Sequence, residues 1–266
     1  MNAREADVAM NKQLRPEIPP EKIIQVNNSK KIDFSKPFKF IYMEWWYEIL
    51  VAVPFLISYI ITIFAAIYFG FRVEGRKNLK ILWKRGCITI SNHCHYFDTV
   101  FANFVVLPRA LHTAVAQRNF EVPIARRLLR IHRAFPIPAN ARGLDMISGP
   151  VGDALKRRHH IHFLPEGNLS MMSQTIHRFR LGAFVLSWRH QAPIVPMVYI
   201  ITPRMFRGRP MGPNWIRMRL VIGEPLFPPP PTDDGYTPYE GLELMAERAA
   251  YWMEETIAAH HREPAA

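Results

Sequence analysis

A histidine and an aspartate that follow one short apolar segment are the residues of this chain best placed to do chemistry. Residues 87–90 are apolar and predict a buried strand, and the loop after them carries His93 and His95. Asp98 then opens a stretch with helical spacing of apolar residues, 98–107. A histidine at the end of a strand and an aspartate in the first turn of the next helix can meet through space.

Such a pair can act as a base and the group that orients it. A neutral imidazole has one donor and one acceptor nitrogen. If Asp98 accepts a hydrogen bond from one N–H of His93, the opposite nitrogen becomes a base directed at solvent or substrate, as in hydrolases and transferases. A purely structural alternative fits the same residues, with His93 and His95 as loop histidines and Asp98 as a helix N-cap.

Composition limits the class of protein. A chain of 266 residues suits one domain of ordinary size with an additional element attached. Its 34 basic and 22 acidic residues give a net charge of +12, which indicates a polyanionic partner such as nucleic acid, anionic lipid or a phosphate-bearing substrate. Two cysteines, Cys87 and Cys94, make neither a disulfide framework nor a zinc site and suggest a reducing compartment.

The N-terminal part of the chain predicts a polar arm followed by a membrane anchor. Residues 1–40 are polar, lack the apolar stretch of a secretory signal peptide, and we expect them to be poorly ordered to about residue 35. Residues 49–71 carry no charge, and this length is close to the roughly 20 residues that span a bilayer as a helix. We therefore predict an anchor at 41–71, with a buried core helix as the alternative.

Residues that flank this apolar run support the anchor. The aromatic cluster at 45–47 is typical of a membrane interface, and Arg72 and Arg76 provide cations just beyond the run. Pro54 and Ser58 permit a kink or a re-entrant hairpin as well as a single straight span.

From residue 72 onward, apolar segments typical of strands alternate with segments typical of helices. We expect strands near 73–75, 87–90, 111–116, 134–138, 160–164, 194–200 and 218–223, and helices near 98–107, 144–158, 181–189 and 239–259. This alternation predicts a single α/β domain over 72–266. Ligand sites in open α/β sheets form beyond the carboxyl ends of strands. Two such ends carry candidate residues, 92–98 and 165–170, and the second offers Glu166 beside Gly167, whose backbone can approach a ligand closely.

Residues 118–133 form an arginine-rich amphipathic segment. Its basic residues are Arg118, Arg126, Arg127, Arg130 and Arg133, and apolar residues lie between them. Such a segment is often a solvated helix face. Beside an apolar anchor, it also suits an anionic membrane surface.

Four blocks of this sequence resemble those of the glycerolipid acyltransferases, the family of 1-acylglycerol-3-phosphate acyltransferases. Residues 92–98 resemble the NHxxxxD block, with four residues between His93 and Asp98, and residues 163–167 resemble the FPEG block. Residues 179–184 and 192–196 resemble two further blocks in the family's order. The resemblance covers residues 73 to about 225 and implies a mixed sheet flanked by helices with an N-terminal helical membrane anchor.

The resemblance also implies a reaction. A fatty acyl group would pass from a thioester, acyl-CoA or acyl carrier protein, to the hydroxyl of a lysophospholipid, most simply 1-acylglycerol-3-phosphate, which would become phosphatidic acid. His93 would be the general base and Asp98 its orienting partner, with no acyl-enzyme, cofactor or metal. The substrate-binding residues implied by the matched blocks are Asn92, Pro165, Glu166 and Gly167. Backbone N–H groups near Gly167 are candidates for stabilising the oxyanion.

The third block departs from the family pattern. The usual sequence is FPEGTRS, with an arginine that engages the phosphate of the acceptor, whereas residues 168–170 here are Asn, Leu and Ser. Arg142, Arg178 or Arg180 could provide the phosphate contact instead. Equally, the acceptor could be a different lysolipid. We expect membrane lipids as partners and an active site on the cytoplasmic face of the membrane.

Two other classes of function fit parts of the sequence. One is a metal-dependent hydrolase; its candidate ligands are His93, His95, Asp98, His159, His160 and His162. Adjacent His159 and His160 cannot both face one site from a strand, which disfavours it. The other is a non-catalytic module that binds nucleic acid or membranes, prompted by the net charge of +12. Aromatic residues that stack bases lie among basic residues in such modules, whereas most aromatics here fall in the anchor and the strands, so we expect no nucleic-acid partner.

Overall fold

The computed structural model describes residues 15–16, 32–34, 36–138, 142–213, 215–231 and 238–262. Most of the polar arm predicted at 1–40 lies outside these residues.

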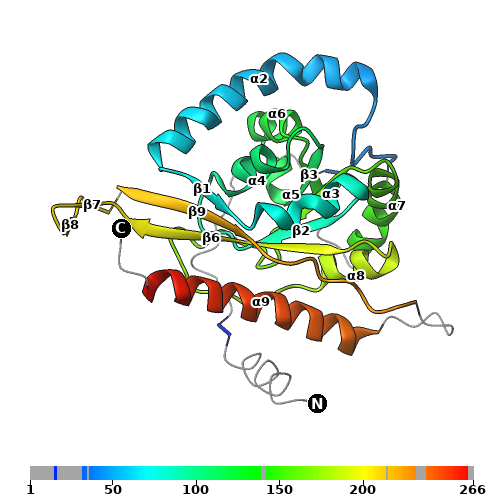
Figure 1. Ribbon diagram of the computed structural model, residues 1–266. Helices are drawn as coiled ribbons and strands as arrows, with labels where there is room; N and C mark the ends of the chain where they lie inside the picture. The colour runs from blue at the N-terminus through cyan, green and yellow to red at the C-terminus, as the bar shows by residue number, and fades with distance from the viewer. Residues whose placement is uncertain are drawn as a thin grey trace.

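A seven-stranded mixed sheet forms the centre of the protein, in the order β1-β9-β6-β2-β5-β3-β4 (Figure 1). Its strands are β1 (Arg72–Glu74), β2 (Ile88–Ser91), β3 (Leu111–Ala116), β4 (Phe135–Ile137), β5 (His160–Phe163), β6 (Ile194–Pro203) and β9 (Ile216–Ile222). Neighbouring strands are parallel except for β6 and β9, which pair antiparallel from Met197–Ile222 to Pro203–Ile216. The α/β fold with a mixed sheet, as predicted, is confirmed.

Helices cover both faces of the sheet. They are α2 (Trp45–Tyr68), α3 (Lys80–Lys84), α4 (Asp98–Val106), α5 (Gln117–Phe120), α6 (Pro123–Ile131), α7 (Gly143–Lys156), α8 (Gly182–Arg189) and α9 (Tyr239–Arg262), with a 3-10 turn, η2, at Arg76–Leu79. Helix α9 packs on one face, and α4, α6 and α2 lie on the other (Figure 1).

Two apolar cores result from the alternation of side chains along the strands. Along β6, Val198 and Ile200 join the core beneath α7, α8 and α9, whereas Met197 and Tyr199 join the core beneath α3 and α4. Successive side chains of a strand point to opposite faces, so one strand supplies both cores. This two-sided burial explains why β6 is a near-continuous apolar run in the sequence.

Helix α2 lies along the outside of the domain. It runs unbroken through Pro54 and arcs over α4 and α6 (Figure 1). Among the described residues it is the one helix long and apolar enough to cross a membrane, by length and composition. Only 11% of its most apolar window is buried. This exposure contradicts the alternative of a buried core helix.

Specific contacts hold the inner face of α2 against the domain. The Tyr47 hydroxyl donates to the Arg130 carbonyl over 2.7 Å, and Ser58 Oγ lies 2.9 Å from His132 Nε2. The rings of Tyr59 and Phe104 stack with centroids 5.2 Å apart. These contacts come from the first half and the middle of the helix, so α2 packs lengthwise and leaves its opposite side apolar and exposed.

The sequence analysis missed a hairpin between the strands that it expected near 194–200 and 218–223. Strands β7 (Met205–Phe206) and β8 (Arg209–Pro210) form a separate two-stranded sheet beyond the ends of β6 and β9. In Figure 1 this hairpin extends away from the rest of the domain.

Candidate active site

The loops after β2 and β5 lie at the same edge of the sheet. The two strands are parallel neighbours, and Ile90 pairs with Phe163 in register. Because the carboxyl ends of parallel neighbours meet at one edge, the loop that carries His93 faces the loop that carries Glu166.

His93 and Asp98 are in contact. Nδ1 of His93 lies 3.1 Å from Oδ2 of Asp98, and that oxygen also accepts from the backbone N–H groups of Cys94 (2.7 Å) and His95 (2.8 Å). Asp98 is fully buried as the first residue of α4, whereas the side chain of His93 is 21% exposed. Nε2 of His93 is therefore the ring nitrogen left facing away from the carboxylate, as a base requires.

Burial and hydrogen bonding shift the pKa of the Asp98 carboxyl group in opposite directions. Burial raises the pKa of Asp98, and the hydrogen bonds from His93, His95 and Cys94 counteract that rise by stabilising the charged form. A carboxylate held this way keeps the His93 ring in one orientation. It also stabilises a positive charge on the ring when the ring takes up a proton.

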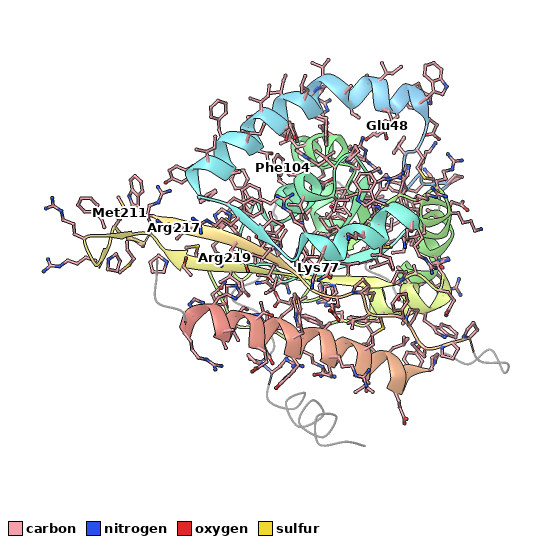
Figure 2. The ribbon with its side chains drawn as sticks, in the orientation of Figure 1. Glu48, Lys77, Phe104, Met211, Arg217 and Arg219 are labelled. Atoms are coloured by element: carbon pink, nitrogen blue, oxygen red, sulfur yellow. The ribbon has the colours of Figure 1, made fainter. Side chains whose placement is uncertain are left out.

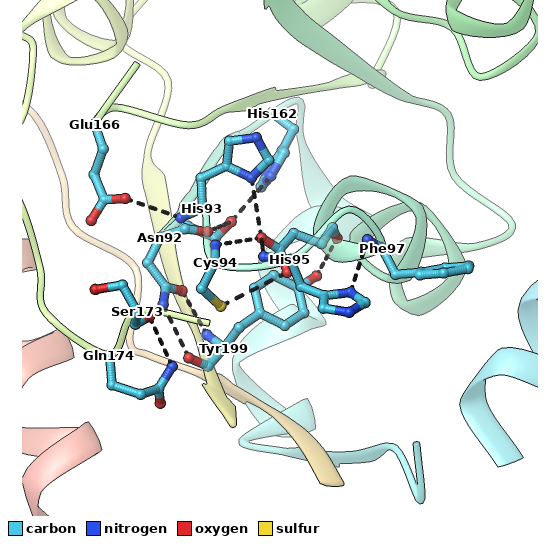
Figure 3. Close-up of polar contacts among 12 residues, drawn as sticks. Asn92, His93, Cys94, His95, Phe97, His162, Glu166, Ser173, Gln174 and Tyr199 are labelled. Carbon is cyan, nitrogen blue, oxygen red and sulfur yellow. Dashed lines mark hydrogen bonds and ion pairs between the residues drawn. The ribbon is translucent and has the colours of Figure 1, made fainter. Parts of the chain in front are cut away.

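Asn92 joins the end of β2 to β6. Its amide donates to the Tyr199 carbonyl over 3.0 Å and accepts from the Tyr199 N–H over 2.7 Å. The Tyr199 hydroxyl in turn donates to the carbonyl of Asp98 (Figure 3). Asn92 is 2% exposed, so its side chain fixes the base of the loop that carries His93.

Glu166 joins the two loops. Its Oε2 accepts from the His93 N–H over 3.1 Å (Figure 3). Its Oε1 accepts from the His177 N–H, also over 3.1 Å, and the residue is 5% exposed. The Ser170 N–H donates to the His93 carbonyl over 2.9 Å. The carboxylate thus acts on the position of His93 through the backbone.

Gly167 is required by its backbone conformation and by a neighbouring arginine. Its φ is +78°, and a Cβ there would lie 2.8 Å from Nε of Arg180. The Gly167 N–H donates to the Leu164 carbonyl over 3.0 Å, so this particular N–H is already engaged within its turn. Pro165 accepts a hydrogen bond from the Arg180 N–H over 2.9 Å, which holds Arg180 against the same turn.

The three candidate arginines lie in different places. Arg180 lies over Gly167, at the loop that faces His93. Arg142 is exposed at the N-cap of α7, and Arg178 is exposed with its N–H 3.4 Å from the Pro16 carbonyl.

Arg118 is the residue that the sequence analysis missed at this site. It lies in α5 directly after β3, and its Nη2 is 2.5 Å from Oδ1 of Asn168. The sequence analysis placed Arg118 only on an amphipathic helix. The signal that could have identified Arg118 is its position two residues beyond the end of β3, at the same sheet edge as the loops after β2 and β5.

The other histidines and the cysteines are engaged in packing. His95 contacts the Phe69 ring, with centroids 5.0 Å apart, and His159 stacks on His112. Within the described part of the chain, no group of three or more His, Cys, Asp or Glu side chains is arranged to hold a metal ion, so the ligands considered for a metal-dependent hydrolase do not form one site there. Burial raises the pKa of the Cys94 thiol well above its ordinary value, so it stays protonated.

A cavity of about 180 Å³ opens beside the loop that carries His93, between α4, β3 and α6. Its lining is mainly apolar; the residues are Tyr96, Thr99, Val100, Asn103, Thr113, Val115, Leu128, Leu129, His132 and Ala134. Tyr96 and Thr99 belong to the segment that carries Asp98, so the cavity begins next to the His93–Asp98 pair.

Comparison with known proteins agrees with this geometry. The model of the acyltransferase family matches residues 70–200, which include both loops of the site. The chain belongs to the acyltransferase family. The 1-acyl-sn-glycerol-3-phosphate acyltransferase beta of Homo sapiens is 26% identical over 134 residues, 50% of this chain and 48% of the human protein. The acyltransferase chain thus spans about half the length of that relative.

A solved structure shares the fold. The crystal structure of the 1-acyl-sn-glycerophosphate (LPA) acyltransferase, PlsC, from Thermotoga maritima aligns with 74% of this acyltransferase and 74% of its own chain. The TM-score is 0.50 and the sequence identity 18%. The likeness supports the arrangement of strands and helices around the central sheet.

Proposed function

We propose that this acyltransferase moves a fatty acyl group from a thioester to the free hydroxyl of 1-acylglycerol-3-phosphate, forming phosphatidic acid. The observation that carries the proposal is the contact of the partly exposed His93 with the buried Asp98. The names of the human and Thermotoga relatives support the choice of acceptor.

The reaction is a direct transfer. Nε2 of His93 takes the proton from the acceptor hydroxyl while the hydroxyl oxygen attacks the thioester carbonyl carbon. Asp98 stabilises the imidazolium that forms. The tetrahedral intermediate then collapses, the carbon–sulfur bond breaks, and the imidazolium returns its proton to the leaving thiolate. The products are the acylated lipid and the free thiol of coenzyme A or acyl carrier protein, and no residue is acylated.

Arg118 and Arg180 supply the phosphate contact in this proposal. Arg118 reaches Asn168 and Arg180 covers Gly167, so both cations lie at the loop where the family pattern has its arginine. A guanidinium suits a phosphate because its N–H groups match two oxygens at once. Arg118→Gln should raise KM for a phosphate-bearing acceptor by about tenfold to a hundredfold, equivalent to about 1.4–3 kcal/mol, and leave KM for the donor unchanged. Arg142→Gln, at α7, is the matched control.

Helix α2 attaches the enzyme to the membrane in this proposal. It lies within one leaflet, parallel to the surface, because its contacts with α4 and α6 bind one side lengthwise to the domain while the other side is apolar. The ring of Phe69, just after α2, contacts His95 of the catalytic loop. An acceptor held in the leaflet would thus reach His93 at the cytoplasmic face. The cavity beside Tyr96 would receive part of an acyl chain.

Acyl transfer by the purified full chain in lipid vesicles tests this function. Wild type is compared with His93→Ala and with the matched control His95→Ala, using acyl-CoA and a panel of lysolipid acceptors. We expect His93→Ala to lose all measurable turnover and His95→Ala, if folded, to keep it. Equal turnover in wild type and His93→Ala would refute the mechanism. His93-dependent turnover with a different lysolipid alone would refute the acceptor.

A further inference from the structure

The hairpin formed by β7 and β8 presents apolar and basic side chains together to solvent. We call residues 204–215 the basic hairpin; Asn214 is outside the described residues. Phe206 is 62% exposed, Met211 42% and Trp215 41%, which is unusual for large apolar side chains gathered on one short element.

In the basic hairpin and the start of β9, which follows it, every charged side chain is positive. Residues 204–219 contain five arginines and neither aspartate nor glutamate. The Arg207 guanidinium lies over the Phe206 ring at 5.4 Å, and that of Arg204 lies over the Trp215 ring at 5.9 Å. A shallow hollow of about 550 Å³ is lined by Phe206, Arg207, Arg209, Pro210 and Met211. Cationic groups therefore border exposed apolar groups throughout the basic hairpin.

The basic hairpin continues the apolar surface of α2. The Trp215 ring lies 6.1 Å from the ring of Tyr68, the last residue of α2, and Arg204 Nη2 donates to the Tyr68 carbonyl over 3.1 Å. Phe64 and Ile67, on the preceding turn of α2, are each 68% exposed. Figure 2 shows Met211 on the projecting hairpin, beyond the end of α2, and its N–H donates to the Arg204 carbonyl over 2.9 Å at the base of the hairpin.

We propose that the basic hairpin is a second membrane contact, specific for anionic phospholipids. Its arginines bind the headgroup phosphates, and Phe206, Met211 and Trp215 enter the interface between headgroups and acyl chains. The proposal rests on the attachment of α2 to the membrane. A bilayer suits this element better than a soluble polyanion does, because a soluble polyanion would leave the apolar side chains in water.

A second membrane contact would orient the sheet edge that carries His93 relative to the bilayer. A single helix lying in a leaflet leaves the domain free to rotate about the helix axis. A second contact, on the hairpin that joins β6 to β9, would limit that rotation and hold the loop of His93 toward the leaflet.

An environment-sensitive dye on a single introduced cysteine tests the contact directly. Cys87 and Cys94 are 0% and 1% exposed, so an added surface cysteine is labelled selectively in the folded protein. Met211→Cys reports on the basic hairpin, Ile57→Cys on the outer side of α2, and Glu240→Cys on α9, across the sheet. Each labelled full-length protein is mixed with phosphatidylcholine vesicles, with and without phosphatidylglycerol.

We expect the dye at position 57 to shift to the blue in both kinds of vesicle. The dye at 211 should shift only when phosphatidylglycerol is present, and the dye at 240 in neither. A shift at 57 with none at 211 would overturn the basic hairpin as a contact while leaving membrane attachment intact. The absence of a shift at both positions would overturn the attachment as well. A shift at 211 caused by soluble coenzyme A without vesicles would show that the hairpin binds donor phosphates instead.

Charge variants give the size of the effect. Arg207→Gln with Arg209→Gln should weaken docking of the hairpin on phosphatidylglycerol vesicles about 30-fold, since each basic residue near an anionic surface contributes about 1 kcal/mol. The matched control removes the same charge at the end of α7, Lys156→Gln with Arg157→Gln, and should change docking less than twofold. Equal weakening by both pairs would mean that only net charge matters, which would overturn the specific contact.

Discussion

Two histidines, one just after β2 and one within the neighbouring strand β5, have opposite surroundings in this acyltransferase. His93 follows β2, is partly exposed, and contacts the carboxylate of Asp98. His162 lies within β5, is fully buried, and contacts the hydroxyls of Thr89 (2.8 Å) and Ser91 (3.3 Å). The His162 ring has a polar contact at each of its two nitrogens, whereas the His93 ring has one at Nδ1 only. Both rings lie near the same sheet edge (Figure 3).

The difference shows what separates a base from a packed histidine. Burial among hydroxyls lowers the pKa of His162 to about 3, so its ring stays neutral. A hydroxyl partner offers no charge to stabilise an imidazolium, and burial excludes substrate. The His93 ring contacts the Asp98 carboxylate through Nδ1, and its side chain is partly exposed to solvent. The partner and the access, more than the residue type, determine which histidine can take a proton.

Replacing the carboxylate should have the largest effect. Asp98→Asn keeps the size of the side chain but holds the wrong tautomer of His93 and leaves an imidazolium without charge stabilisation. We expect kcat to fall by roughly 10⁴-fold, as in triads that lose their aspartate. The measurement is acyl transfer at saturating substrate, with circular dichroism to check folding. A folded variant with more than a tenth of wild-type turnover would mean that the contact between His93 and Asp98 is only structural.

Replacing the buried histidine should affect stability and leave the chemistry unchanged. His162→Gln leaves Thr89 and Ser91 imperfectly paired, and we expect the free energy of unfolding to fall by about 1–3 kcal/mol. The pH profile of kcat should keep its wild-type midpoint. A shifted midpoint would place His162 in the proton path and remove the contrast between the two rings.

The same variant should change the pH dependence of stability. The pKa of His162 is lowered from 6.5 to about 3, so below pH 6.5 the unfolded chain binds a proton that the native state does not. Stability is therefore lost as pH falls from 6.5 toward 3, by about 1.4 kcal/mol per pH unit. The measurement is denaturant unfolding at several pH values between 6.5 and 3. In His162→Gln, the slope of the free energy of unfolding against pH should be smaller than in wild type by this amount. An unchanged slope would contradict a neutral His162 in the native state.

The smallest effect should come from the cysteine beside the pair. Cys94 Sγ lies 4.0 Å from Asp98 Oδ1, yet burial keeps its thiol protonated and the proposed transfer is direct. Cys94→Ala should keep turnover within about threefold, because it removes packing near the pair and no catalytic group. Loss of turnover without loss of folding, or an acyl group trapped on Cys94 of wild type, would instead indicate a covalent route.

Much of the fold could be predicted because its strands are buried on both faces. β6 begins with a continuous run of mostly apolar residues, which is typical of a strand buried on both faces. β2 and β5 are buried at every position although they alternate apolar residues with Thr, Ser or His, and their apolar residues were enough to predict them as strands. The start of β9 at Ile216 was missed because Arg217 and Arg219 mark the segment as basic. Ile216, Met218 and Leu220 alternate with them and point inward, a period of two that the charge obscured.

Within the site, the sequence alone determined the contact between His93 and Asp98, because a strand end, a tight loop and a helix start bring residues five apart together. The tertiary structure decided the rest. Glu166 reaches His93 across 73 residues and Arg118 reaches Asn168 across 50, contacts that require β2, β5 and β3 to be neighbours. Strand order depends on how the helices pack over the sheet, and no local pattern encodes it.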